Sequence, residues 1–387
     1  MTAALILSGG GARAAYQVGV LHAVARLLPE ETINPFPIIC GTSAGAINAL
    51  ALAAHPGRLR QRVAGLLRIW RDLQPHQVYR TDWLGVLRNS LGLAGSLFWG
   101  GYVPCASIAL LDNAPLRALL EQHIRFQHLD PAIARGELAA VCVTAMHYDS
   151  GHSVSFFQGT QPGWSRSRRR GERTALTIEH LLASAAIPIL FPAMRIGSSY
   201  YGDGALRQLR PLSPALRLGA DRLFVIGVSD NLRHPNRHTR TSHPPSVGQI
   251  LGHMLNAAFI DSIESEVEML ETLNLLAHRV GEPVARDGGT LRPVKALIIA
   301  PSEPLDRIAA ERVHCLPRTL RLFLRAIGAT REGSGASAAS YLLFEPGFCR
   351  RLLALGYADA MAQRQQILEF FRCPDADAGA ITAADTP

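Results

Sequence analysis

Lysine is almost absent from this chain of 387 residues. Lys295 is the only one, so arginine supplies nearly all of the 39 basic side chains behind the net charge of +8. The arginines are spread along the chain, and no helix-turn-helix, zinc-finger or RNA-binding motif accompanies them. We therefore predict no nucleic-acid partner, although this charge can attract phosphate groups or an anionic membrane surface.

Cysteine is also sparse. The six cysteines lie far apart and form no C-x-x-C pair, which argues against both a zinc site and a disulfide framework. The pattern fits a reducing compartment best. We predict no metal site.

A long uninterrupted apolar run is missing as well. The strongest transmembrane candidate, 32–57, is broken by polar residues and prolines such as Asn34 and Pro37, and a buried strand followed by a buried helix explains it better. The first residues reach a glycine run too early for a signal peptide and include no basic region. We expect a soluble cytoplasmic protein, with peripheral contact at the inner membrane face as an open alternative.

A glycine-rich loop follows the first apolar segment. Residues 3–8 read as a strand, Gly9-Gly10-Gly11-Ala12-Arg13 as a loop, and 15–28 as a helix. Such a loop presents backbone N–H groups at a helix N-terminus, where they can hold a phosphate or a developing oxyanion. The pattern Gly9-x-Gly11-x-x-Ala14 also fits a dinucleotide fingerprint with Glu30 or Glu31 as ribose ligand, but these two acids sit in a turn before the next strand.

A second motif places a serine between two glycines. In Gly41-Thr42-Ser43-Ala44-Gly45, the serine stands where a predicted strand, starting near Pro37, meets a predicted helix. A nucleophile elbow needs small residues on both sides, because the backbone turns sharply and the helix packs closely behind it. Ser43 is therefore the candidate nucleophile, with Gly41 and Gly45 as the elbow glycines.

An aspartate between glycines is the third motif. Residues 194–201 read as a hairpin that delivers Gly202-Asp203-Gly204-Ala205. From the local pattern alone Asp203 is either a turn residue or a catalytic acid, and the turn is the commoner role.

Four further segments carry expectations that bear on function. The arginine run 164–173 is predicted to be a solvated loop, with a site for anionic head groups as the sharper hypothesis. Residues 246–280 form one long amphipathic pattern, predicted to pack on the core or else to cover the site or pair with a second subunit as a homodimer. Residues 333–340 read as a Gly/Ser/Ala loop, and 91–104 as core, lid or lipid-facing surface.

Together the three motifs resemble those of the patatin-like phospholipase family. The glycine loop 9–13, the elbow 41–45 and Asp203-Gly204-Ala205 stand in the family's order, although Ala14 replaces a further glycine of the family pattern. The resemblance implies an α/β fold of three α/β/α layers around a mainly parallel sheet, plus a helical C-terminal extension. We expect a catalytic domain over 1–300, an extension packed on it over 301–372, and a disordered tail over 373–387.

The resemblance also implies a reaction and its residues. Ser43 would be the nucleophile of a Ser-Asp dyad with Asp203 as its base, and the loop Gly9 to Arg13 would form the oxyanion hole of a phospholipase A or lysophospholipase. No cofactor is implied, and the partner is a lipid substrate. Two alternatives stay open: an α/β-hydrolase triad using His278 or His314, and a non-catalytic dinucleotide-binding protein using the loop 9–14.

Overall fold

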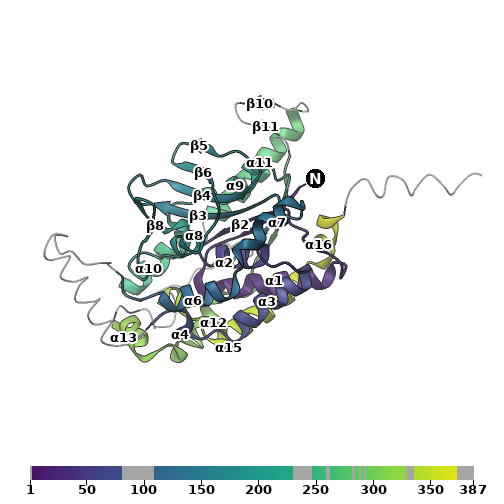
Figure 1. Ribbon diagram of the computed structural model, residues 1–387. Helices are drawn as coiled ribbons and strands as arrows, with labels where there is room; N and C mark the ends of the chain where they lie inside the picture. The colour runs from purple at the N-terminus through teal and green to yellow at the C-terminus, as the bar shows by residue number, and fades with distance from the viewer. Residues whose placement is uncertain are drawn as a thin grey trace, which may run out of the picture.

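The protein is described here by a computed structural model that covers residues 2–80, 109–229, 246–258, 262–280, 284–286, 289–291, 293–326, 328 and 335–372 (Figure 1). The segment 91–104 and the tail 373–387 lie outside the described residues.

A mixed sheet of ten strands forms the centre, in the order β12-β9-β1-β2-β3-β4-β6-β5, with β8 paired to β3 and β7 paired to β8. The five strands from β12 to β3 run parallel, whereas β4, β5, β7 and β8 enter through antiparallel pairs. The strands are β1 (Ala3–Leu7), β2 (Ile38–Thr42), β3 (Ala140–His147), β4 (Ser153–Gly159), β5 (Trp164–Arg166), β6 (Arg169–Arg173), β7 (Met194–Ile196), β8 (Ser199–Asp203), β9 (Arg222–Ile226) and β12 (Lys295–Ile299). A separate pair, β10 (Val284–Arg286) and β11 (Gly289–Leu291), is antiparallel.

Alternating side chains of the central strands enter two hydrophobic layers, as expected for a sheet buried on both faces. One layer contains Leu5 and Ile39, and the other contains Ile6 and Cys40. The second layer is covered by α9 (Ser213–Arg217) and α11 (Ser262–Val280). Figure 1 shows these two helices on one side of the sheet and α1, α3 and α15 on the other. The predicted three-layer α/β/α fold with a mainly parallel sheet and C-terminal helices is therefore confirmed.

The first layer is covered by helices from both ends of the chain. They are α1 (Ala15–Leu27), α2 (Ala44–Ala53), α3 (Leu59–Arg71), α4 (Pro75–Val78), α6 (Ala114–His123), α7 (Leu129–Ala134), α8 (Ile178–Ser184), α10 (Val247–Asn256), α12 (Leu305–Ala310), α13 (Arg318–Ala326), α14 (Gly335–Leu342), α15 (Pro346–Ala362) and α16 (Arg364–Phe371). Short 3-10 turns also occur at η1 (Gly11–Ala14), η2 (Phe126–His128), η3 (Gly204–Leu206) and η5 (Val313–Cys315).

Helix α15 lies against α1 along paired glycines. A Cβ on Gly19 would stand 2.2 Å from the carbonyl oxygen of Leu353, and one on Gly356 would stand 2.2 Å from that of Tyr16. The two backbones therefore approach more closely than any side chain would allow. The C-terminal helices share one hydrophobic core with β1 and α1.

Two local predictions were wrong, for the arginine run 164–173 and for the loop 333–340. The arginine run 164–173 forms the β5–β6 hairpin, because β6 pairs with β4 and Trp164 stacks on Phe157 at 5.1 Å, and these contacts override the loop-like charge pattern. The predicted helix 246–280 is helical in α10 and α11, and residues 259–261 between them lie outside the described residues; the buried residues of α10 and α11 lie in different hydrophobic layers. Most of the predicted loop 333–340 is helix α14, whose small residues, such as Ala338 and Ala339, are buried.

No helix within the described part of the chain is both long and apolar enough to cross a lipid bilayer.

Candidate active site

Ser43 occupies a sharp turn between β2 and α2. Its backbone has φ 55° and ψ −130°, a left-handed conformation that costs energy for any residue with a Cβ. A Cβ on Gly45 would lie 2.3 Å from the carbonyl oxygen of Leu7, and one on Gly41 would lie 2.4 Å from that of Gly45. Small residues on both sides are thus required for the helix to pack behind the strand, which is the geometry of a nucleophile elbow.

Asp203 reaches Ser43 from the end of a different strand. β8 and β2 both pair with the edge of β3 that β4 leaves free: β2 runs parallel and pairs Thr42 with Thr144, and β8 runs antiparallel and pairs Asp203 with the next residue, Ala145. The Ser43 hydroxyl donates a hydrogen bond of 2.6 Å to Oδ2 of Asp203, and the N–H of Ala205 donates one of 3.0 Å to Oδ1. Both partners are buried, with Ser43 exposed by 2% and Asp203 by 0%.

Burial controls the charge of this carboxyl group. Removal from water raises the pKa of Asp203 to about 7, although the hydrogen bonds from Ser43 and from the N–H of Ala205 act in the opposite direction. Near neutral pH the group is therefore balanced between its two protonation states. This is the property that lets a carboxylate accept and return a proton.

The glycine loop lies beside the elbow because β1 and β2 are parallel neighbours, with Leu7 paired to Gly41. Gly9 and Gly10 follow β1, and Gly11 begins η1 with φ 55°. No described residue accepts a hydrogen bond from the N–H groups of Gly10, Gly11 or Ala12. Ala14, which replaces the family's further glycine, has ordinary helical angles (φ −64°, ψ −11°), so its methyl group is accommodated without strain.

Arg13 turns away from this loop toward the C-terminal helices. Its side chain is buried, its Nε donates a 2.7 Å hydrogen bond to Ser340, and its terminal nitrogen bonds to Ser337 and forms an ion pair with Asp306. The guanidinium also lies over the ring of Tyr341, 4.3 Å from its centre. Arg13 therefore fixes the loop to α12 and α14.

Sequence reasoning missed these C-terminal partners. The carbonyl oxygen of Tyr341 would be 2.1 Å from a Cβ on Gly11, so α14 packs directly against the loop. Residues Asp306, Ser337, Ser340 and Tyr341 are common types in no recognisable motif, and α14 was expected to be a loop. Nothing in the sequence could have identified them.

Buried polar side chains also hold the elbow in place, through hydrogen bonds to the backbone of Ser43 and to helix α2. The Ser43 N–H donates to Oγ of Ser184 (2.8 Å), whose hydroxyl donates to the carbonyl oxygen of Thr144 (2.6 Å). Asn48 on α2 donates to Gln17 on α1 (3.0 Å) and accepts from the indole N–H of Trp70 on α3 (2.8 Å). These hydrogen bonds fix the position of α2, which follows the elbow, relative to α1, which follows the glycine loop.

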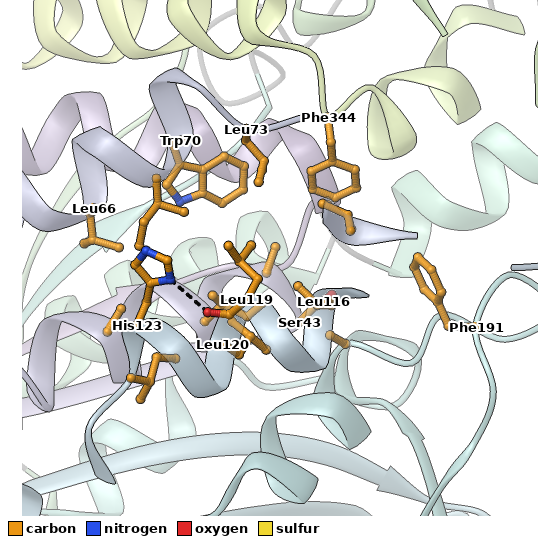
Figure 2. Close-up of a pocket in the computed structure, with 18 of the residues that line it drawn as sticks. Ser43, Leu66, Trp70, Leu73, Leu116, Leu119, Leu120, His123, Phe191 and Phe344 are labelled. Atoms are coloured by element: carbon orange, nitrogen blue, oxygen red, sulfur yellow. Dashed lines mark hydrogen bonds between the residues drawn. The ribbon is translucent and has the colours of Figure 1, made fainter. Parts of the chain in front are cut away.

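An apolar cavity opens at Ser43 (Figure 2). It contains about 750 Å³ of unfilled space, part of it open to solvent. Its walls come from α2, α3, α4, α6, the segment after α8, and the end of α14 with Phe344. Only four of the side chains that line it carry an oxygen or nitrogen atom, namely those of Ser43, Trp70, His123 and Tyr341. The others are hydrocarbon.

The other candidates from the sequence do not meet at this site. No described histidine hydrogen-bonds to Ser43 or Asp203: His314 is exposed, and His123 bonds through Nδ1 to the carbonyl oxygen of Leu119. The side chain of His278 lies outside the described residues. Glu30 is exposed and pairs with Arg60 at 3.1 Å. Within the described residues no group of three or more His, Cys, Asp or Glu side chains is placed to hold a metal ion.

Two kinds of known protein are similar to this chain. A curated relative, described as a cGAMP-activated phospholipase from Pseudomonas aeruginosa (strain BWHPSA011 / Pa011), is 30% identical over 203 residues, which are 52% of this chain and 52% of the relative. The alignment thus spans about half of that relative's length. Among solved structures, human GIVD cytosolic phospholipase A2 aligns with a TM-score of 0.45 and 13% identity over 96% of this chain and 60% of that chain. VipD from Legionella pneumophila aligns with a TM-score of 0.36 and 14% identity, over 94% and 67% respectively.

The family model described as patatin-like phospholipase matches residues 5–216, more than half of the chain. The glycine loop, the elbow and Asp203 all lie inside this range, whereas α12 and α14 lie beyond it. By this match the chain belongs to the patatin-like phospholipase family.

Proposed function

We propose that the protein is a lipid acyl hydrolase of the phospholipase A or lysophospholipase type, with Ser43 as nucleophile and Asp203 as general base. The observation that carries this proposal is the 2.6 Å hydrogen bond between Ser43 Oγ and Asp203 Oδ2 beside an apolar cavity. Ionised Asp203 accepts the hydroxyl proton as Oγ attacks the ester carbonyl. It then returns that proton to the leaving alcohol, and an acyl-serine remains.

The second half of the reaction uses the same two groups. Asp203 takes a proton from water, the resulting hydroxide attacks the acyl carbon, and Ser43 recovers its proton as the fatty acid leaves. The carboxyl group is unchanged at the end of each cycle. Its pKa of about 7 suits both directions of transfer at neutral pH.

The N–H groups of Gly10, Gly11 and Ala12 are the proposed oxyanion donors. Among the described residues none accepts a hydrogen bond from these N–H groups, which lie at the start of η1 and next to β2, the strand that ends just before Ser43. Donors fixed where negative charge develops lower the barrier because they need no reorganisation, and the loss of one such donor costs about 10²–10³ in rate. Arg13 is proposed to contribute indirectly, because its hydrogen bonds to Ser337 and Ser340 hold the loop against α14.

The lining of the cavity supports an acyl chain as the group that enters it. Transfer of a carbon chain from water to such a surface lowers the free energy of the system. A dinucleotide, by contrast, would need polar partners for its phosphates and riboses, and Glu30 lies in an exposed turn paired with Arg60.

A fluorophosphonate probe and a substrate panel test the proposal. Wild-type protein should be labelled at Ser43 and should hydrolyse phospholipid, lysophospholipid or acylglycerol, and Ser43→Ala should lose both properties. The assays are run with and without cGAMP, because the curated relative is described as cGAMP-activated. Absence of Ser43-dependent hydrolysis in every assay would refute the proposed function, and dinucleotide binding without labelling would favour the non-catalytic alternative.

A further inference from the structure

We propose that a wall one side chain thick, centred on Leu66 and Leu119, ends the acyl cavity and limits the length of the chain that the enzyme accepts. The inference rests on the proposed function and deepens it, because it assigns a substrate property to residues remote from Ser43. Its ligand class is the straight acyl chain of medium length.

Two helices form the long sides of the cavity with matching stripes. On α6 the lining residues are Leu116, Leu119, Leu120 and His123; on α3 they are Leu66, Ile69 and Trp70, followed by Leu73 just after the helix ends. Both sets follow the i, i+3, i+4, i+7 spacing that places side chains on one face of a helix. The seven steps along α6 from Leu116 to His123 span about 10 Å at 1.5 Å per residue, so the cavity extends well beyond the reacting carbonyl.

Figure 2 shows the direction of this channel. Ser43 lies near Leu116, toward the side where Phe191 is drawn, whereas Leu66 and His123 lie at the opposite end. An acyl group attached to Ser43 would therefore pass Leu116 first, then Leu119, and reach His123 last.

Behind that far end lies a second hollow with a different lining. It is bordered by polar side chains, including His55, Arg68 and Gln122, and it opens to solvent. The residues that line both hollows are Ala51, Leu66, Ile69, Leu73, Leu119 and His123. The shared residues mark the boundary where the apolar channel meets the polar cleft.

This division has an energetic consequence. Each methylene group buried in the channel should raise kcat/KM by about fourfold, whereas a methylene pushed past the wall into a polar, wet cleft gains nothing. A plot of kcat/KM against chain length should therefore rise and then break. From the length of the α6 stripe we expect the break at roughly 8 to 12 carbons.

The test measures kcat/KM for p-nitrophenyl esters of straight acids from C4 to C18. Leu119→Ala and Leu66→Ala open the wall and should move the break to longer chains by at least two carbons. Ala51→Leu adds volume at the wall and should move it to shorter chains. Leu116→Ala is the matched control, because Leu116 lies one turn earlier on α6 and lines only the channel; it should lower kcat/KM while leaving the break where it is.

A binding measurement separates this inference from the proposed function. Titration calorimetry of the same straight-chain fatty acids with Ser43→Ala protein should give a break in affinity that moves in the same way in the wall variants, whether or not any ester is hydrolysed. An unmoved break in Leu119→Ala and Ala51→Leu, or an equal shift in Leu116→Ala, would overturn the inference. Loss of hydrolysis alone would contradict only the proposed function.

Discussion

Asp203 and Glu266 are two buried carboxyl groups on opposite faces of one sheet. Burial raises the pKa of each to about 7. Asp203 accepts hydrogen bonds from a serine hydroxyl and from the N–H of Ala205. Glu266 lies on α11 and accepts a 2.6 Å hydrogen bond from the N–H of Leu212, just before α9.

The difference between them is the neighbouring group. Asp203 faces a hydroxyl held in a strained turn at the mouth of an apolar cavity, whereas Glu266 faces a backbone amide and has Arg169 and Arg210 nearby. A raised pKa marks both residues equally, so it cannot identify a catalytic base without the geometry. The comparison supports the proposal that Asp203 is the general base, and it gives Glu266 a role in attaching α11 to the segment before α9.

The largest expected effect separates the two acids by activity. Asp203→Asn should lower kcat/KM by about 10³–10⁴, because Ser43 then lacks its proton acceptor. Glu266→Gln should change it by less than about threefold, since its carboxyl group lies outside the site. Steady-state hydrolysis by both variants is the measurement, with circular dichroism to verify folding. Equal losses in the two variants would remove the distinction.

Stability should respond to pH through both groups in the same direction. Each folded-state pKa of about 7 lies above its ordinary value, so each carboxyl stabilises the fold below its unfolded-state pKa, and this contribution is lost as pH rises from about 4 to 7. The loss is on the order of 3 kcal/mol per group. Denaturant unfolding at pH 5 and pH 8 should therefore show a smaller pH dependence in Asp203→Asn and in Glu266→Gln than in wild type. A pH dependence as large as that of wild type in either variant would contradict that group's raised pKa.

The dependence of kcat/KM on pH should follow the ionisation of Asp203 and not that of Glu266. Because the base must be ionised, kcat/KM should rise about tenfold per pH unit below a pKa of about 7 and level off above it. Glu266→Gln should keep this profile. A profile that is flat between pH 5 and 8, or one that Glu266→Gln displaces, would show that another group governs the rate.

The smallest effect concerns the charge near Glu266. Arg169 favours the ionised form of that carboxyl, so Arg169→Gln should raise the pKa of Glu266 and shift the pH at which stability is lost upward by a few tenths of a unit. Hydrolysis should be unchanged. The same unfolding series, carried out on Arg169→Gln with Arg166→Gln as a control, measures the shift; an equal shift in the control would mean that net charge alone is responsible.

The N-terminal half of the site was readable because its chemistry depends on backbone geometry. Tight turns after β1 and β2 demand glycine or other small residues, and those demands leave patterns such as Gly41-x-Ser43-x-Gly45. Parallel strand pairing then brings the two turns together, which is a general property of α/β sheets. The fold class followed from the same motifs, through resemblance to a family.

The rest of the site depends on contacts that leave no local pattern. Ser337 and Ser340 hydrogen-bond to Arg13, which lies more than 300 residues earlier in the sequence, and the backbone of Tyr341 packs against Gly11. The sequence pattern of this segment nevertheless predicts a loop. The β5–β6 hairpin was missed for a related reason. Its many arginines predicted a solvent-exposed loop, whereas pairing with β4, which the local sequence does not reveal, makes β6 a strand.

The most direct test of the central claim is the rate of covalent labelling of Ser43 by a fluorophosphonate at pH 8. We predict that wild type, His123→Ala, His278→Ala and His314→Ala label at similar rates, whereas Asp203→Asn is slower by at least 10³-fold. Normal labelling of Asp203→Asn, or loss of labelling in a histidine variant that remains folded, would contradict the dyad.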